Sequence, residues 1–420
     1  MSLKPNDYMP RLIDKKIEGL LQVSGAISIE GPKWCGKTFT SLNHASSVIN
    51  MDDEETRSRF MLNPELVLNE SKPELIDEWT REPTVWDKIR RKCDLLETKG
   101  NYILSCSTSL LDENKIFHSG AGRISRLKMN TMSLFESNDS SGDISIMDMY
   151  EGREIVKTVR KISLEDLANL IIRGGWPANI NVAKDKCGLM PKYYINSILE
   201  KDIYESKNVD SVKMQKLLKS LARNESTVVS NNKLIKDISD NDDLNIDKRT
   251  VSDYIEILEK LNLFSNQLSY STNYRSPERV GKNVKRHFTD PSLAAALLNM
   301  NANKLIADLK TFGFLFEALV ERDLKIYMDY LDGNLYHFRD NVTGLEVDSI
   351  LEFSDGEYAA VEIKLGFNQF KEACESLLKF QDNVTKKPKF MCVICGYNEN
   401  IVKDPETGIY IVPITALKPE

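Results

Sequence analysis

The stretch Gly31-Pro32-Lys33-Trp34-Cys35-Gly36-Lys37-Thr38 fits the phosphate-binding loop pattern G-x-x-x-x-G-K-[ST]. Residues 26–30 before it are typical of a buried strand, and residues 38–45 can open a helix. In such a loop, backbone N–H groups surround the β-phosphate, and the helix N-terminus adds a favourable dipole. We expect Lys37 to reach the β- and γ-phosphates and the Thr38 hydroxyl to hold Mg²⁺. The sequence therefore predicts a site for ATP and Mg²⁺ over residues 31–38.

The composition is that of an ordinary globular protein. The 420 residues, long enough for two to four domains, are 41% hydrophobic and 28% charged. A net charge of −7 argues against nucleic acid binding over most of the protein surface but not against a local basic patch. No apolar run approaches the roughly 18 residues that span a bilayer, and the N-terminus lacks a signal-peptide core. With seven scattered cysteines, the sequence favours a cytoplasmic protein with no membrane partner.

Short apolar runs alternate with helical patterns over the first 135 or so residues, which is the rhythm of an α/β sheet. We expect strands at residues 25–30, 47–51, 74–77 and 101–106, then a polar loop or flexible insertion at 136–143. Residues 163–207 have a helical pattern interrupted by a sharp turn at 173–177. The last 115 residues form another α/β unit, with a long helix at 310–329 and strands at 335–338, 346–353, 358–364 and 389–394.

Adjacent acids follow the strand predicted at 74–77. Hydrolysis of a nucleotide needs a carboxylate for Mg²⁺ and a group that positions water. We expect Asp77 to act on the Mg²⁺ shell and Glu78 to polarise the attacking water. The sequence therefore places Thr38 and Asp77 at the metal and Glu78 in catalysis.

Two further side chains are candidates near the γ-phosphate. The strand at 101–106 ends in hydroxyls, so Ser105 or Ser107 can sense the γ-phosphate, although ordinary strand-end capping explains them as well. Arg123 is a candidate for stabilising charge, within a subunit or between subunits. The alternative is that Arg123 pairs with a carboxylate.

Residues 211–268 resemble a winged helix, with helices expected at 214–223, 232–238 and 247–261 and a wing strand at 263–271. Lys248, Arg249 and Thr250 lie at the start of the third helix, where a DNA-reading helix would place its contacts. A winged helix used only for protein packing explains the pattern equally well, and acids between 240 and 247 would repel phosphates.

A resemblance to a known family rests on an ordered set of motifs: GPKWCGKT, LIDEW, PTVWDKIRR, GNYILSCSTSLL, HSGAGRI and MSLFES. The chain resembles a large prokaryotic family of predicted AAA-type ATPases whose C-terminal domain of unknown function has a winged helix and a nuclease-like fold. The tail matches at GGWPANI, NYRSPERVGKNVKRHFTDPSLAAALL, GLEVDSILEF and AAVEIKLG. The family usually has Thr-Gly-Ser where this chain has Ser105-Cys106-Ser107, which leaves the sensor assignment open.

Carboxylates near the C-terminus resemble the D…(D/E)-x-K signature of restriction-endonuclease-like nucleases. On a strand, Glu362 and Lys364 share a face, so a metal ligand would lie beside a lysine able to orient water. An odd-length turn centred on Asp355 would place Asp348 opposite Glu362, whereas a two-residue turn would put them on opposite faces. Glu317, on the preceding helix, could complete the cluster. The alternative is a half-exposed hairpin with alternating charges.

Cys392 and Cys395 form a C-x-x-C within a predicted strand. Residues three apart on a strand point to opposite faces, so these thiols cannot chelate one metal ion. We expect both to belong to the core.

Together these patterns predict an α/β multidomain protein. The expected domains are a P-loop AAA-type ATPase domain (1–135), a helical lid or linker (136–207), a winged-helix domain (208–300) and a restriction-endonuclease-like domain (301–420). The function expected is Mg²⁺-dependent ATP hydrolysis, with a tail that acts on DNA. The alternative is a nucleotide-switched regulatory or interaction protein with a catalytically inactive tail. Self-association into a homo-oligomer is open.

Overall fold

The computed structural model describes residues 3–96, 98–107, 118–203, 209–239, 246–273, 275–276, 279, 284–340 and 342–420. The chain divides into two compact units. The first unit comprises Met1–Thr131 with Ile257–Leu263, and the second comprises Met132–Glu256 with Phe264–Glu420.

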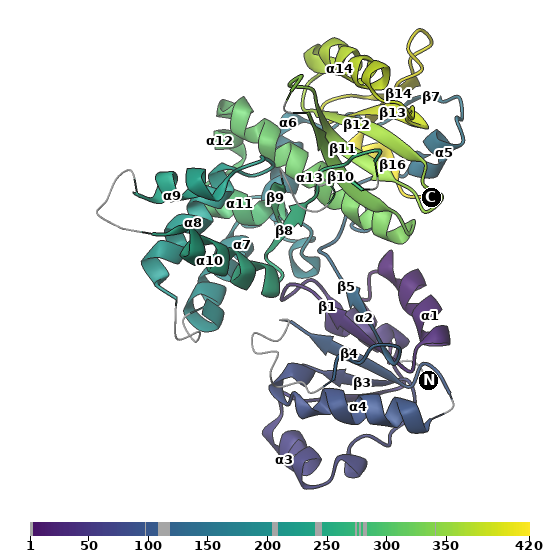
Figure 1. Ribbon diagram of the computed structural model, residues 1–420, viewed down its shortest axis with the longest axis vertical. Coiled ribbons are helices and arrows are strands. Elements are labelled where there is room, and N and C mark those ends of the chain that lie inside the picture. The colour runs from purple at the N-terminus through teal and green to yellow at the C-terminus, as the bar shows by residue number, and fades with distance from the viewer. Residues whose placement is uncertain are drawn as a thin grey trace. The chain divides into compact units, whose positions relative to one another are not determined.

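The first unit is built on a sheet of five parallel strands in the order β2-β3-β4-β1-β5, of which Figure 1 labels β1, β3, β4 and β5. The strands are β1 Ala26–Glu30, β2 Ser47–Asn50, β3 Glu74–Asp77, β4 Tyr102–Cys106 and β5 Ile124–Lys128. The helices are α1 Ile13–Val23, α2 Lys37–His44, α3 Glu54–Leu62 and α4 Thr84–Leu95, with 3₁₀ turns at Pro64–Leu66 and Trp79–Arg81. The four predicted strands are confirmed, and β5 is an addition.

Alternating side chains give this sheet two buried faces, because successive residues of a strand point to opposite sides. One face joins Ile27 and Ile103 to Ile17 of α1. The other joins Ile76 and Leu104 to Trp86 and Ile89 of α4. Burying each such side chain contributes about 1.5–3 kcal/mol. Helices thus pack on both faces of the sheet. Because the strands are parallel, their carboxyl ends lie at one edge, and the predicted nucleotide site lies at this edge.

The second unit begins with a helical part. Its elements are β6 Ile144–Ser145, α5 Ile146–Tyr150, β7 Val156–Thr158, α6 Leu164–Arg173, a 3₁₀ turn Pro177–Asn179, α7 Leu189–Ser197, a π-helical turn Ile198–Ile203, α8 Ser211–Arg223, α9 Asn231–Ser239, α10 Lys248–Lys260, β8 Phe264–Gln267, β9 Lys285–Phe288, α11 Pro291–Leu297 and α12 Ala302–Ala307. The last residues of α10 belong to the first unit. Helices α8, α9 and α10 and strand β8 lie where three helices and a strand were expected, and the winged-helix fold itself stays a prediction. The acids at 240–245 and residues 204–207 lie outside the described residues.

The second unit ends in a mixed sheet of seven strands in the order β10-β11-β12-β13-β15-β14-β7. The C-terminal elements are α13 Leu309–Tyr330, β10 Asn334–Arg339, β11 Glu346–Glu352, β12 Tyr358–Lys364, a 3₁₀ turn Phe367–Gln369, α14 Phe370–Asn383, β13 Phe390–Cys395, β14 Asn400–Lys403, β15 Tyr410–Pro413, a 3₁₀ turn Ile414–Ala416 and β16 Leu417–Lys418. The predicted long helix and four strands are confirmed. Helix α14 is the crossover between the parallel strands β12 and β13.

Two local predictions have clear outcomes. Cys392 and Cys395 are free, fully buried thiols of β13, so the core assignment is confirmed. Residues 136–143 form a loop as predicted, but not a flexible insertion. Glu136 and Ser140 are buried, and the Ser140 hydroxyl donates to the carbonyl oxygen of Leu417 at 2.7 Å.

Candidate functional site

The loop between β1 and α2 has the backbone that phosphate binding requires. A Cβ on Gly31 would lie 2.2 Å from the carbonyl oxygen of Met129, so no larger residue fits there. Gly36 has φ 103°, a left-handed conformation that glycine adopts readily, and α2 begins directly after it. Of the remaining predicted loop residues, Pro32 and Cys35 are buried, Lys33 is half-buried and Trp34 is exposed.

Lys37 lies inside the loop rather than in solvent. Its side chain is buried, and its ammonium donates to the carbonyl oxygens of Gly31 at 3.0 Å and Pro32 at 2.7 Å. The ammonium is thereby fixed at the start of α2, where the helix N-terminus also favours an anion.

Arg11 also contacts the phosphate-binding loop, and the sequence did not predict a role for it. This buried guanidinium donates to the carbonyl oxygen of Cys35 at 2.8 Å, and to those of Asn130 at 2.9 Å and Thr131 at 3.1 Å. It therefore ties the phosphate-binding loop to the segment that follows β5. A single arginine before α1 carries no recognisable motif, so the sequence offered no signal for this role.

Predicted metal and sensor residues meet at the carboxyl edge of the sheet. The Thr38 hydroxyl donates to Oδ2 of Asp77 at 3.1 Å, and the Ser105 hydroxyl donates to Oδ1 of the same carboxylate. The Ser107 hydroxyl donates to Oε1 of Glu78 at 2.8 Å. Ser105 therefore lies beside the predicted metal ligand, whereas Ser107 lies beside the predicted catalytic carboxylate.

Backbone geometry explains how neighbouring acids reach the same edge. Side chains of consecutive strand residues alternate between faces, but Glu78 leaves the strand with φ 51°. Its carboxylate reaches Ser107, which follows β4. An oxygen set made of the Thr38 hydroxyl and the Asp77 carboxylate fits Mg²⁺, which prefers oxygen ligands and takes its remaining ligands from phosphates and water.

Arg123 lies at the wrong edge of the sheet for a role in its own subunit. It directly precedes β5, whose Ile124 is level with Ala26 at the start of β1, whereas the phosphate-binding loop follows Glu30 at the other end. Its Nε donates to Oδ1 of Asp94 at 2.7 Å, as the simpler alternative predicted. The prediction of a charge-stabilising role within one subunit is therefore wrong, and only the role between subunits stays open.

The predicted carboxylates of the tail come together. The register of β11 and β12 pairs Ser349 with Val361, and its continuation by one residue sets Asp348 opposite Glu362. The turn is centred on Asp355, so the odd-length alternative is confirmed. Lys364 bridges the two acids, with its Nζ 3.0 Å from Oδ2 of Asp348 and 2.5 Å from Oε2 of Glu362.

A second lysine, Lys285 of β9, lies at this cluster and was not predicted. Its ammonium pairs with Glu317, contacts Oε1 of Glu321 at 2.7 Å and donates to the carbonyl oxygen of Asp348 at 3.3 Å. Burial raises the pKa of Glu317 to about 7, against the effect of Lys285. Burial and the charge of Asp348 raise the pKa of Glu362 to about 8. The ammonium groups of Lys285 and Lys364 supply the positive charge that faces the carboxylates of this cluster.

No group of three or more His, Cys, Asp or Glu side chains is arranged to hold a metal ion within the described residues. In the tail, the ammonium groups of Lys285 and Lys364 form ion pairs with the acids. The predicted DNA contacts Lys248 and Arg249 are exposed at the start of α10, where the Thr250 N–H donates to Oδ1 of Asp247 at 2.7 Å. Asp247 thus caps this helix, and the expected repulsion between its carboxylate and DNA phosphates is a separate effect.

Three family models match separate parts of the chain. Residues 24–138 match the AAA domain, residues 164–304 match a domain of unknown function (DUF8612), and residues 312–417 match another (DUF4143). The N-terminal part is therefore an AAA-type ATPase domain within an α/β multidomain protein. The chain joins this domain to a tail of two domains of unknown function, which confirms the resemblance to AAA-type ATPases with a tail of unknown function, whereas the winged-helix and nuclease-like folds of the tail stay predictions.

Among solved structures, the chain is similar to the Walker-type ATPase PABY2304 of Pyrococcus abyssi, with 12% identity and a TM-score of 0.45 over 71% of this chain and 98% of that one. It is also similar to the Aeropyrum pernix ORC1 protein in complex with DNA, with 13% identity and a TM-score of 0.27 over 73% and 97% of the two chains. Because both TM-scores are below 0.5, neither likeness carries a functional conclusion. No curated protein matches the sequence significantly. Within the described residues, no helix has the length and apolarity to cross a membrane.

Proposed function

We propose that the first unit binds ATP with Mg²⁺ and hydrolyses it to ADP and phosphate. The observation that carries the proposal is the chain of hydrogen bonds Thr38–Asp77–Ser105 beside the phosphate-binding loop. Lys37 would bind the β- and γ-phosphates, and Thr38 and Asp77 would hold the metal ion. Bound Mg²⁺ would neutralise charge that develops on the phosphates. Glu78, aligned by Ser107, would take the proton of the attacking water.

Phosphate release and nucleotide binding by the full chain test this proposal together. Lys37→Ala should abolish phosphate release. Glu78→Gln should keep ATP binding and slow turnover by about a hundredfold or more, which is the usual contribution of a general base. Glu55→Gln, an exposed carboxylate change in α3, is the matched control and should behave like the parent. Unchanged hydrolysis in both site variants would refute the assignment.

For the tail we infer a regulatory or binding role rather than DNA cleavage. Lys285 favours this alternative, because a buried ammonium paired with Glu317 and Glu321 opposes a divalent cation at the same carboxylates. Under this proposal the nucleotide state of the first unit is the switch, DNA and a second copy of the chain are candidate partners, and the protein acts in the cytoplasm.

A cleavage assay with plasmid and linear DNA in Mg²⁺ or Mn²⁺ separates the two tail hypotheses. The parent and Lys364→Ala should show equal, negligible cleavage. Cleavage by the parent that is lost in Lys364→Ala would establish a nuclease and overturn the inference. A gel-shift comparison of the parent with Lys248→Ala/Arg249→Ala tests DNA binding at α10 independently, because these side chains are exposed and distant in sequence from the cluster.

A further inference from the structure

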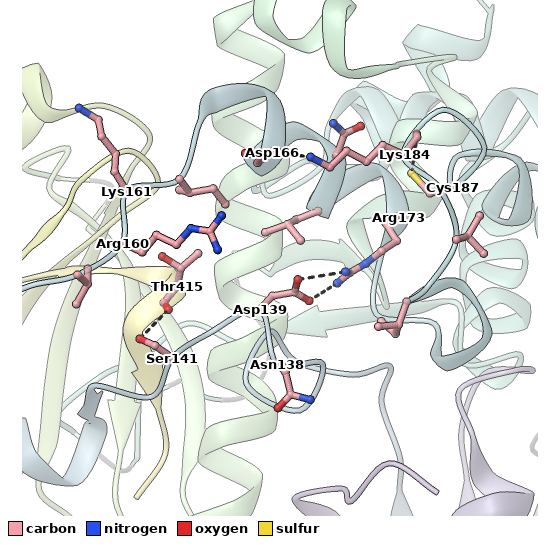
Figure 2. A pocket seen from close by; sticks show the side chains of 16 residues that line it. Asn138, Asp139, Ser141, Arg160, Lys161, Asp166, Arg173, Lys184, Cys187 and Thr415 are labelled. Atoms are coloured by element: carbon pink, nitrogen blue, oxygen red, sulfur yellow. Dashed lines mark hydrogen bonds and ion pairs between the residues drawn. The ribbon is translucent and has the colours of Figure 1, made fainter. Parts of the chain in front are cut away.

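A cavity of about 570 Å³ opens within the second unit, outside both sites described above. Figure 2 shows its lining side chains, which come from the loop at 138–141, the segment between β7 and α6, helix α6, the loop at 180–187 and Thr415. Pockets for small organic ligands usually enclose about 300–1,000 Å³. The cavity is therefore large enough for a ligand of mononucleotide size.

The acids that line the cavity already have partners. Arg173 is a buried residue of the cavity lining and donates to Asp139 in a bidentate ion pair, with one N–O distance of 2.6 Å and another of 3.3 Å (Figure 2). Asp166 pairs with Lys184 and also accepts from the hydroxyl of Ser163 at 2.8 Å. These pairs are electrically neutral, so any further cation in the cavity adds positive charge that they do not offset.

Arg160 is this further cation. Its side chain makes no hydrogen bond or ion pair with the part of the chain that the structure describes. Figure 2 shows its guanidinium pointing into the cavity, toward the side on which Asp139 and Arg173 lie. The neighbouring Lys161 points away, with its ammonium over the ring of Tyr397. The uncompensated charge inside the cavity is therefore that of Arg160.

The backbone on either side of Arg160 is held in place. The N–H of Val159 donates to the carbonyl oxygen of Glu399 at 2.7 Å, beside strand β14. On the other side, Ser163 caps α6 by accepting from the N–H of Asp166. A guanidinium on an anchored segment loses less freedom when it binds a ligand, so its ion pair retains more of its strength.

We propose that this cavity binds a small organic phosphate of mononucleotide size, with Arg160 as its phosphate-binding residue. A guanidinium presents a planar fork of donors that matches phosphate oxygens in two parallel hydrogen bonds. The cavity wall also includes Leu170, Ile180 and Val182, an apolar surface suited to a base or another flat organic body. The proposal is independent of the ATPase site in the first unit.

Calorimetric titration of the full chain tests the proposal. Lys37→Ala is used as the background for every arm, so that phosphate binding at the loop of the first unit does not contribute. The probes are AMP, adenosine and inorganic phosphate. We expect AMP to bind, Arg160→Gln to weaken it about tenfold or more, and adenosine to bind correspondingly less well. Arg59→Gln, an exposed arginine of α3, is the matched control and should leave AMP affinity unchanged.

Each outcome decides a part of the proposal. Equal AMP affinity with and without Arg160 overturns the site, as does the absence of AMP binding at millimolar concentration. Inorganic phosphate that binds as tightly as AMP supports the arginine but contradicts the need for an organic body. Equal binding of adenosine and AMP contradicts recognition of the phosphate. Because Arg160 is exposed, its replacement should leave the thermal unfolding temperature of the chain unchanged.

Discussion

Replacement of Lys285 by methionine should destabilise the second unit strongly. The lysine side chain is 8% exposed and pairs with Glu317 and Glu321, which are 16% and 3% exposed. Methionine has a similar length, so the change removes the charge and leaves little empty volume. Removing one partner of a buried ion pair costs about 3–5 kcal/mol, because the remaining charge is buried without compensation.

Backbone hydrogen exchange in peptides from α13 and β11 measures this cost at pH 8. A loss of about 3–5 kcal/mol corresponds to exchange that is faster by roughly a hundredfold to several thousandfold. Lys386→Met removes an exposed pair with Glu357 and is the matched control. It should cost at most about 1 kcal/mol. Lys285→Met with Glu321→Gln should recover part of the loss, since one uncompensated carboxylate is gone.

Exchange in Lys285→Met at the rate of the parent would refute this reasoning. It would mean that the carboxylates are solvated or neutral without the lysine. Hydrogen exchange in the presence of Mn²⁺ is a second measurement. A cation that replaces the missing ammonium should slow exchange in Lys285→Met and leave the exchange of the parent unchanged. Equal slowing in both proteins would show that Lys285 does not keep divalent cations out.

Three further predictions concern the first unit. Arg11→Leu should weaken ATP binding about tenfold or more, measured with a fluorescent analogue, because the phosphate-binding loop loses its tie to the segment after β5; rescue by Arg11→Lys would contradict a role for the whole guanidinium fork. Arg123→Ala should leave hydrolysis in dilute protein unchanged, and a hundredfold loss there would contradict its place at the far edge of the sheet. Burial alone would raise the pKa of Asp14, but hydrogen bonds from His44 and Tyr8 outweigh burial and lower it. Asp14→Asn should therefore cost about 1–3 kcal/mol of unfolding free energy at pH 7, and urea titrations should show the difference shrinking as the pH falls through the lowered pKa of Asp14. A difference that does not shrink as the solution is acidified would contradict the assignment.

The nucleotide site was predictable because its parts are local patterns. Gly31–Thr38 follows the strand predicted at 25–30, and Asp77-Glu78 lies at the end of the strand predicted at 74–77, so a parallel sheet alone brings them to one edge. The tail needed one more piece of information. Whether Asp348 faces Glu362 depends on a single residue in the turn at Asp355, and both turn lengths were compatible with the sequence.

Arg11 and Lys285 were missed because their partners are distant in sequence. Arg11 donates to Asn130, 119 positions later, and Lys285 pairs with Glu317, 32 positions later. Arg11 belongs to no recognisable motif. Lys285 lies within the stretch NYRSPERVGKNVKRHFTDPSLAAALL, but that resemblance assigned it no role, and β9 was not predicted as a strand. Arg123 shows the opposite failure, since a motif pointed to it but the strand that follows carries it to the wrong edge.

Strand β9 gives the tail cluster a dependence that its motif does not reveal. Besides Lys285, it carries His287, whose ring lies 3.3 Å from Oε2 of Glu321 and 3.4 Å from Oε1 of Glu225. Burial lowers the pKa of His287, so the ring stays neutral, and burial raises the pKa of Glu225. The acids around Asp348 are therefore set in a buried network shared with the helical part of the unit. A substitution at Lys285 would therefore alter the charge at the cluster without any change in the D…E-x-K residues themselves.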